Sequence, residues 1–380
     1  MTTEIVGIHI NNFLLNHNLL SAIEIILVLD LKDHKTSLRK ERKEKTIRLR
    51  FNKQIQDQLI AKKMMTHPFK VLSRIKRNLI TSPFLFNPLF SLTKNNLRIL
   101  TYHGISPLAL PLPEFEKQLQ FISKNFDCFW ASEIPDLLKK EPGPRPRLVV
   151  TFDDGLKNHV LNAMPLLDKY GIKATFYIPV DLVRNQEMLW NHEVRCHLMM
   201  MDNRDLPEGI GPFSERENKK FLEVSACIEH LKTLPIEDRQ VVQESLRKNR
   251  KDKEYLPWML EEYQLMSPDD FKCLSPLIEI GSHTLTHPIL TTIPDDQLVN
   301  EIRESRDQLE ALTAKPVLSF CYPNGIHSEK VVKVVEDFYP IAVSTNEGFV
   351  SQKDRMSTLN RIPAGKNREE FLIRLIRPTA

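Results

Sequence analysis

Two adjacent aspartates follow a strongly strand-forming run at residues 148–152. The run Leu-Val-Val-Thr-Phe is β-branched, aromatic and uninterrupted, which is typical of a buried strand. It opens directly onto Asp153, Asp154 and Gly155. Because successive side chains of a strand point to opposite faces, the two carboxylates diverge and can take different roles at one site. A plain Asp-Gly turn is the alternative interpretation of these residues taken alone.

A pair of histidines follows a second apolar run far downstream. Residues 278–282 read Ile-Glu-Ile-Gly-Ser, and His283 and His287 come after them. The spacing of four predicts one helical turn at the strand end, which would point both imidazoles the same way. With 12 histidines in 380 residues, chance gives about 0.4 pairs at this spacing, so the context must decide. A lone histidine on an apolar strand is usually a core residue, but two at a strand end, with acids ending another strand, favour metal ligation.

The order of strand-like and helical segments predicts the fold. Apolar residues recur at helical spacing in 113–126, 157–170 and 295–314, and strand-like runs lie at 97–104, 148–152, 173–179, 278–282, 316–321, 341–345 and 359–363. This alternation favours a parallel sheet with helices outside it. We therefore expect an α/β fold, a distorted (β/α) barrel, complete or incomplete, of about seven parallel strands, with its site at their carboxyl ends.

Three regions are predicted along the chain. Residues 1–65 form a basic, poorly ordered N-terminal extension, residues 66–95 a peripheral lead-in, and residues 96–380 the barrel. Met64 or Met65 is a candidate for the biological start. Between about residues 181 and 276 the alternation stops, and a segment this long predicts a mostly helical insertion over the mouth of the barrel.

Charge and cysteine usage exclude several classes of partner. A net charge of +4 does not imply a nucleic acid. Between residues 32 and 53, ten Lys/Arg stand against three Asp/Glu, which indicates a solvated segment or, alternatively, peripheral contact with an anionic membrane. The apolar run at 22–29 is too short to span a bilayer and lacks the pattern of a signal peptide.

The cysteines indicate the compartment of the protein. Five cysteines without a Cys-x-x-Cys spacing fit a reducing compartment, so we expect a protein that is cytoplasmic or peripheral to the inner face of the membrane.

Three motifs carry a resemblance to a known family. Thr151–Gly155, Ser282–His287 and Phe320–Gly325 resemble, in this order, the signatures of the metal-dependent polysaccharide deacetylases, carbohydrate esterase family 4, which act on chitooligosaccharides and poly-N-acetylglucosamine. The resemblance covers about residues 97 to 365. It implies a hydrolase of carbon–nitrogen bonds other than peptide bonds, acting on an N-acetylated glycan of the cell envelope. It also implies one divalent metal ion, zinc first, with cobalt, nickel, manganese or iron as alternatives.

The expected chemistry assigns different roles to the two aspartates. One carboxylate and two imidazoles can hold a divalent ion and leave open positions for water and a substrate carbonyl. A second, unligated carboxylate can take the proton of the water. The resemblance implies Asp153 as this base and Asp154, His283 and His287 as the ligands, with metal-bound water as the nucleophile.

Five further residues are candidates. His103 ends the first predicted strand, where a core or turn histidine would look the same; the resemblance to the poly-N-acetylglucosamine subgroup implies that it is the general acid. The third-motif loop, Tyr322, Pro323 and Asn324, is implied to bind substrate and to offer a backbone N–H to the oxyanion. Trp190 is either a stacking platform for a sugar ring or a core residue.

The chain departs from the family at two positions. Cys321 stands where many members carry an arginine that orients the base, and Leu359-Asn360-Arg361 stands where they carry a late histidine. An aspartate base without a cationic neighbour is poorly held, so we expect Arg361 to contact Asp153 from the last strand. An ordinary surface ion pair is the alternative for Arg361.

Two other classes of protein remain as alternatives. Non-haem iron oxygenases use the same ligand set of two histidines and one carboxylate, although they have no use for a second aspartate. A non-catalytic carbohydrate-binding protein on the same fold would need no base. The substrate is expected to be a polysaccharide or a lipid-linked oligosaccharide.

Overall fold

The computed structural model describes residues 80–207, 210–234, 236–249 and 254–377. The basic extension predicted for residues 1–65, and with it the expected membrane contact, lies outside these residues. The described chain forms two compact units, one of residues 80–196 and 254–377, and one of residues 197–207, 210–234 and 236–249. Each unit is described by itself.

The larger unit is built on a sheet of parallel strands. They are β1 (Arg98–Tyr102), β2 (Asp127–Phe129), β3 (Arg147–Phe152), β4 (Ala174–Ile178), β5 (Ile278–Ser282), β6 (Ser319–Cys321), β7 (Ile341–Glu347) and β8 (Leu359–Pro363). Seven of them close a ring in the order β1, β8, β7, β6, β5, β4 and β3, because β3 pairs with β1 as well as with β4. The predicted α/β barrel is therefore confirmed, and of the two forms expected it takes the complete one.

The remaining strand, β2, lies along the same edge of β3 as β4. It pairs with residues 147–149 at the start of β3, whereas β4 pairs with Thr151 and Phe152 at its end. The three residues of β2 are only half-buried. They are too few to show a strand pattern, and for this reason β2 was not predicted from the sequence.

Burial on both faces explains the residue types of the strands. All five residues of β1 and of β4 are buried, as are residues 148–152 of β3. One face fills the barrel interior and the other is covered by helices, so these strands read as continuous runs rather than as alternating ones. The aspartate doublet marks the point where β3 leaves this core.

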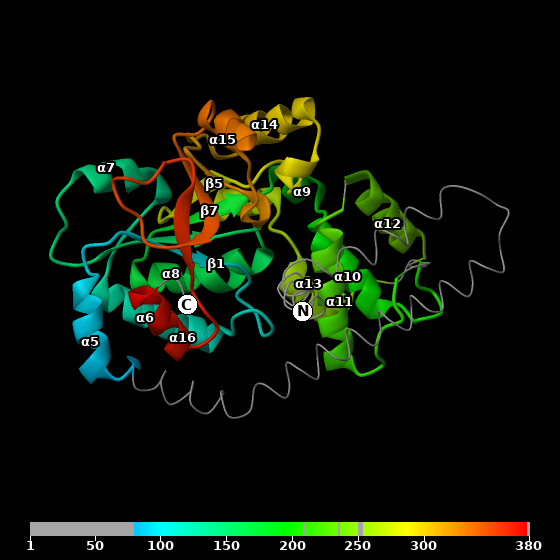
Figure 1. Cartoon of the computed structure of the whole chain (residues 1–380), viewed down its shortest axis with the longest axis horizontal. Helices are drawn as coiled ribbons and strands as arrows, with labels where there is room; N and C mark the ends of the chain where they lie inside the picture. Colours follow the sequence, from blue (N-terminus) through cyan, green and yellow to red (C-terminus); the bar gives the residue numbers. More distant parts are fainter. Residues whose placement is uncertain (1–79, 208–209, 235, 250–253, 378–380) are drawn as a thin grey trace, which may run out of the picture. The chain divides into compact units, whose positions relative to one another are not determined.

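Helices surround the barrel. They are α5 (Pro83–Leu92), α6 (Leu112–Asn125), α7 (Ile134–Lys139), α8 (Met164–Tyr170), α9 (Val180–Asn185), α13 (Pro257–Tyr263), α14 (Asp295–Thr313), α15 (Glu329–Glu336) and α16 (Arg368–Ile376). In Figure 1, α14 and α15 lie outside β5 and β7, whereas α6, α8 and α16 lie on the side of β1. The stripe predicted for α14 is present, since Leu298, Ile302 and Leu309 are buried.

The smaller unit is helical where it is described. Helix α10 (Trp190–Met200) ends in it, and α11 (Glu217–Leu231) and α12 (Ile236–Asn249) follow. Helix α11 buries Val224, Ile228 and Leu231. Among the described residues of both units, no helix combines the length and the apolar character needed to cross a membrane.

A buried arginine connects helices α5 and α16 to the first strand of the barrel. Arg98 of β1 is fully buried, and its guanidinium donates to the carbonyls of Leu375 (2.9 Å), Asn96 (2.9 Å) and Thr93 (2.8 Å). The ring of Phe349 lies 4.8 Å from the guanidinium carbon. Since Thr93 ends α5 and Leu375 lies in α16, one side chain connects both helices to the barrel.

Replacing Arg98 with methionine would remove the guanidinium donors from these carbonyls, of which that of Thr93 keeps the N–H of Asn96 (3.1 Å). We expect Arg98→Met to lower the free energy of unfolding in urea by about 2–4 kcal/mol, because each buried carbonyl left unpaired costs about 1–3 kcal/mol. Arg303→Met is the matched control: Arg303 is exposed and, among the described residues, bonds only to its helix neighbours Asn300 and Glu304, so its loss should cost less than about 0.5 kcal/mol. Equal losses in the two variants would contradict this role of Arg98.

Candidate metal centre and active site

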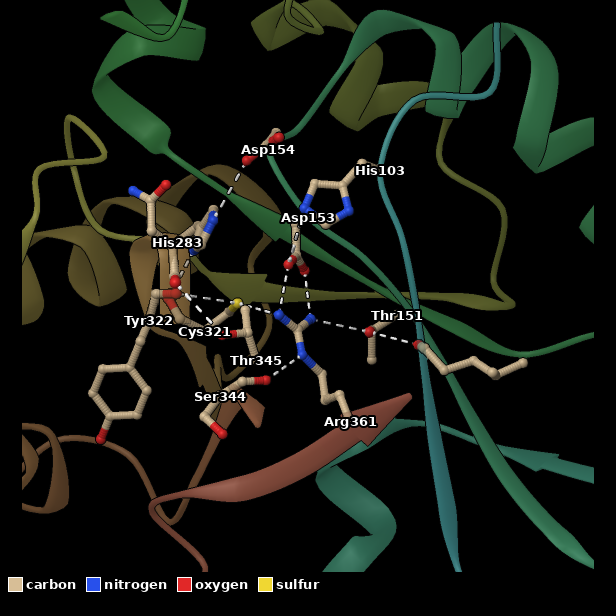
Figure 2. A network of polar contacts seen from close by, with 12 residues as sticks. His103, Thr151, Asp153, Asp154, His283, Cys321, Tyr322, Ser344, Thr345 and Arg361 are labelled. Atoms are coloured by element: carbon tan, nitrogen blue, oxygen red, sulfur yellow. Dashed lines mark hydrogen bonds and ion pairs between the residues drawn. The ribbon is translucent and has the colours of Figure 1, made fainter. Parts of the chain in front are cut away.

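Four polar residues meet at the carboxyl ends of the barrel strands (Figure 2). His103 follows β1, Asp153 and Asp154 follow β3, and His283 follows β5. The backbone fixes their register, since the Asp153 N–H donates to the carbonyl of Tyr102 over 3.0 Å. Parallel strands present their carboxyl ends on one side, and this brings together residues that lie far apart in the sequence.

The two aspartates diverge at the end of β3. Asp154 has a φ of +77° and Gly155 one of +60°, left-handed values that an aspartate keeps only where its neighbours hold it. The Asp153 carboxylate faces Arg361, whereas the Asp154 carboxylate faces His283 (Figure 2). Both aspartates are buried. Adjacent carboxylates therefore occupy two different electrostatic environments.

Asp154, His283 and His287 form a compact group of ligand atoms. The Asp154 Oδ1 lies 3.5 Å from Nε2 of His283 and 3.5 Å from Nε2 of His287, and all three atoms lie within 4.8 Å of one another. Two atoms that each lie about 2.0–2.1 Å from a tetrahedral ion are about 3.3–3.4 Å apart. The group thus has the spacing of a metal site.

The tautomer of His283 supports a cation at this position. Its Nδ1 lies 2.7 Å from the carbonyl of Cys321. A carbonyl only accepts, so Nδ1 carries the proton of the neutral ring and Nε2 presents a lone pair to Asp154. A lone pair that faces a carboxylate oxygen in a buried site needs a cation or a proton between them. The residues therefore fit a divalent ion.

Burial also shapes the ionisation of the two histidines. Desolvation, followed by the repulsion of His283, lowers the pKa of His287 to about 3, so His287 is neutral and able to ligate. For His283, desolvation again opposes the charged form, but contacts with Cys321 and Asp154 outweigh it and raise the pKa. A proton and a metal ion therefore compete for Nε2 of His283.

The turn that carries both histidines is not the helical turn expected from their spacing. Thr284 has a φ of +70° and His287 one of +57°, so the chain bends instead of coiling. Glu301 of α14 holds the bend, because its carboxylate accepts the N–H groups of Leu285 (2.9 Å) and Thr286 (3.0 Å) and the Thr286 hydroxyl (2.6 Å). Glu301 was not predicted, since an acidic residue on an outer helix gives no signal of its own.

Arg361 of β8 forms a bidentate ion pair with Asp153 (Figure 2). Its Nη1 lies 2.7 Å from Oδ1 and its Nη2 2.6 Å from Oδ2, and both side chains are buried. The guanidinium also donates to the Ser344 carbonyl (2.7 Å), the Thr151 hydroxyl (3.3 Å) and the Cys321 sulfur (3.3 Å). This is the contact expected from the sequence. Its burial disagrees with the alternative of a surface ion pair.

The ion pair keeps Asp153 ionised. Burial alone would raise its pKa, but the charge and hydrogen bonds of Arg361 outweigh burial and lower the pKa to about 2. An aspartate of the unfolded chain has a pKa of about 3.9. The pair therefore stabilises the fold at pH values above the unfolded pKa, and this stabilisation is lost as the pH falls toward the folded value.

A second group of possible ligands shares one member with the first. Asp153, His283 and Cys321 also offer atoms within 4.8 Å of one another. However, the Arg361 guanidinium already occupies both oxygens of Asp153 and faces the sulfur of Cys321. Burial also raises the pKa of the Cys321 thiol, and a protonated thiol is not a metal ligand. A cation is therefore disfavoured at this second group.

His103 lies beside the ion pair with most of its side chain open to solvent. Its Nε2 is 3.9 Å from Oδ2 of Asp153, and its side chain is 58% exposed. The distance is longer than a hydrogen bond. An exposed imidazole in this position is free to contact a molecule that binds next to Asp153.

The other sequence-predicted residues are placed differently from expectation. Tyr322 is buried, its hydroxyl donates to the Ser357 carbonyl (2.8 Å) and its N–H to the Val343 carbonyl (3.3 Å). Both groups are used within the fold, and the expected role of Tyr322 toward a substrate or an oxyanion stays a prediction. Pro323 is buried as well. Asn324 is half-buried, and its Nδ2 has no hydrogen-bond partner among the described residues, so it stays a candidate.

Trp190 is a core residue. It is 8% exposed, and a platform for a sugar ring needs an open aromatic face. The burial of Trp190 agrees with the alternative of a core tryptophan, and the stacking role stays a prediction.

The fold and the site can be compared with those of known proteins. The closed (β/α) barrel places a group of possible metal ligands, and next to it an ionised carboxylate, at the carboxyl ends of its strands. A family model described as polysaccharide deacetylase matches residues 140–197 and 258–339, the segments that contain all three motifs. In these segments the chain is similar to the polysaccharide deacetylases.

Individual relatives are distant. YxkH of Bacillus subtilis, which carries the polysaccharide deacetylase name, is 22% identical over 272 residues, 70% of this chain and 70% of that protein. The Streptococcus pyogenes deacetylase PplD is 19% identical, with a TM-score of 0.49 over 74% of this chain and 99% of its own. IcaB from Ammonifex degensii is 15% identical, with a TM-score of 0.48 over 74% of this chain and 97% of its own.

The two ligand groups can be told apart by substitution. His287 belongs only to the first group and Cys321 only to the second. We expect His287→Gln to lose tightly bound zinc or cobalt in equilibrium dialysis, because a site with two ligands holds these ions far more weakly than one with three. Cys321→Ser should keep the ion. The reverse pattern, with the ion lost in Cys321→Ser and kept in His287→Gln, would move the cation to the second group.

Proposed function

We propose that the protein hydrolyses the acetamido groups of a polysaccharide or a lipid-linked oligosaccharide. The observation that carries this proposal is that the two adjacent aspartates at the end of β3 have different partners. Arg361 keeps Asp153 ionised, whereas the adjacent Asp154 faces two imidazoles. Metal-assisted amide hydrolysis uses a cation and a base at the same carbonyl. The match to the polysaccharide deacetylase model supports a glycan as the substrate.

The cation site in this proposal consists of Asp154, His283 and His287. Zinc is the first candidate for two imidazoles and one carboxylate, and cobalt, nickel, manganese and iron are the alternatives. When bound, a divalent ion supplies Lewis-acid chemistry, because it polarises the acetamide carbonyl and lowers the pKa of water beside it.

Asp153 is the proposed general base. Its carboxylate accepts a proton as the oxygen of a water molecule bonds to the acetamide carbon. Its pKa of about 2 keeps it ionised at physiological pH, so the accepting form is present before the water arrives. Arg361 holds both carboxylate oxygens and so fixes the direction from which the proton is taken. Arg361 is thus a positioning residue for the base.

His103 is the proposed general acid. Breaking the carbon–nitrogen bond releases an amine, which departs readily only when it is protonated. The exposed imidazole of His103, 3.9 Å from Asp153, can give this proton to the departing nitrogen. The products are acetate and the free amine of the sugar.

The competing functions do not explain Asp153. A non-haem iron oxygenase would use the same ligand group, and a non-catalytic sugar-binding protein on this fold would need neither group. Neither function requires a buried carboxylate that Arg361 keeps ionised next to the ligand group. Hydrolysis gives this carboxylate a role.

Acetate release from N-acetylated oligosaccharides, screened over a panel of divalent metals, tests the proposal. We expect Asp153→Asn to lower the rate about 10²–10⁴-fold, because the amide cannot accept the proton of the water. The variant should still bind the metal ion. Asp136→Asn is the matched control, since the Asp136 side chain is 72% exposed on α7, and it should react at the wild-type rate. An undiminished rate in Asp153→Asn, or no acetate release with any metal, would refute the proposed function.

A further inference from the structure

A buried histidine outside the three motifs contacts the backbone of His103. His159 begins a π-helical turn that leads into α8, and it is fully buried. Its Nε2 lies 2.9 Å from the carbonyl oxygen of His103. Because this carbonyl only accepts, Nε2 must carry the hydrogen. The other ring nitrogen, Nδ1, is buried and has no hydrogen-bond partner among the described residues.

The surroundings hold the His159 ring in one orientation and one charge state. The rings of Phe152 and Phe176 lie 5.2 and 5.4 Å away, centroid to centroid. Burial lowers the pKa of His159 to about 4, so the ring is neutral at physiological pH. It therefore presents a constant N–H donor to the carbonyl of His103.

Neighbours of His159 hold the next turn of the same loop. The Asn158 side-chain oxygen accepts the N–H of Ile105 over 3.0 Å, and the Asn162 side-chain amide donates to the carbonyl of Ile105 over 2.7 Å. These contacts come from the segment that directly follows Asp154 and Gly155. The peptide after β1 is thus held by the residues that follow the aspartate doublet.

The side chain of His103 has no comparable support from the part of the chain that the structure describes. It is 58% exposed, and its separation of 3.9 Å from Asp153 is longer than a hydrogen bond. The position of a side chain depends on the position of its own backbone. The hydrogen bond from His159 to the His103 carbonyl therefore helps to set the position of the His103 imidazole.

We propose that His159 is a positioning residue, whose N–H fixes the His103 peptide and thereby places the His103 imidazole beside Asp153. The consequence for catalysis rests on the proposed function, in which His103 protonates the departing amine. His159 itself touches neither the substrate nor the reacting atoms.

Two variants of similar size separate the hydrogen bond from simple packing. His159→Gln keeps an N–H donor near the position of Nε2, whereas His159→Met fills similar space without one. Each full-length variant is assayed on an N-acetylglucosamine oligomer and on para-nitrophenyl acetate. In both reactions water adds to the acetyl carbon, but the amine must gain a proton to depart, whereas nitrophenolate leaves as the anion.

We expect His159→Met to lower kcat on the oligomer by about 10–100-fold, since small misplacements of a catalytic group cost up to about 10²-fold. Its KM on the oligomer and its rate on the nitrophenyl ester should change little. His159→Gln should restore most of the lost kcat. An equal loss on both substrates, an unchanged kcat in His159→Met, or an equal loss in the two variants would overturn the proposal.

A measurement without substrate keeps the inference separate from the proposed function. NMR relaxation of isotope-labelled histidine, assigned with His103→Gln, reports how ordered the His103 ring is. We expect less order in His159→Met than in the wild type and in His159→Gln. Equal order in all three proteins would also refute the positioning role. If the order changes but no N-acetylated sugar is hydrolysed by the wild type, the proposed function fails and the positioning stands.

Discussion

The ion pair between Arg361 and Asp153 links the barrel to the chemistry of the site. The guanidinium starts from β8 and contacts β3, β6 and β7 through Thr151, Cys321 and Ser344. Both charges are buried, and a buried charge is tolerated only when its partner is present; removing one partner of such a pair typically costs about 3–5 kcal/mol. The closed ring of strands, which sets the positions of these contacts, therefore also sets the ionisation of Asp153.

The same pair explains how two neighbouring carboxylates differ. Asp153 is neutralised by Arg361, so Asp154 stands alone toward His283 and His287. The left-handed backbone of Asp154 turns it away from the arginine at the end of β3. Two titratable groups whose environments differ in this way can serve as base and ligand within one site. The pairing β1–β3, which closes the barrel, brings His103 to the same place.

Much of this arrangement could be predicted from the sequence. The barrel strands are buried on both faces and appear as continuous apolar runs. The motif residues lie directly at strand ends, where parallel topology must gather them. The contact of Arg361 with Asp153 could be predicted because the arginine that many family members carry is replaced by Cys321 here. The buried aspartate still needs a positively charged partner.

The remaining features depend on tertiary contacts that leave no local pattern. Glu301 holds the bend after His283 from a distant helix, and His159 reaches the carbonyl of His103 from another. The burial of Tyr322 and Trp190 could not be predicted, because aromatic residues look the same in sequence whether they face a ligand or the core. For these two aromatic residues the deciding quantity is the burial of the side chain.

The pKa of Asp153 tests the central claim most directly. The carboxyl carbon of Asp153 can be titrated by NMR in the wild type and in Arg361→Met, with Arg361→Lys as a second variant that retains the positive charge. The account predicts that wild-type Asp153 stays ionised down to a pH of about 2, whereas in Arg361→Met it titrates above about 4, because burial then acts without opposition. A wild-type Asp153 that titrates at or above the ordinary value, or a pKa that does not change in Arg361→Met, would contradict it.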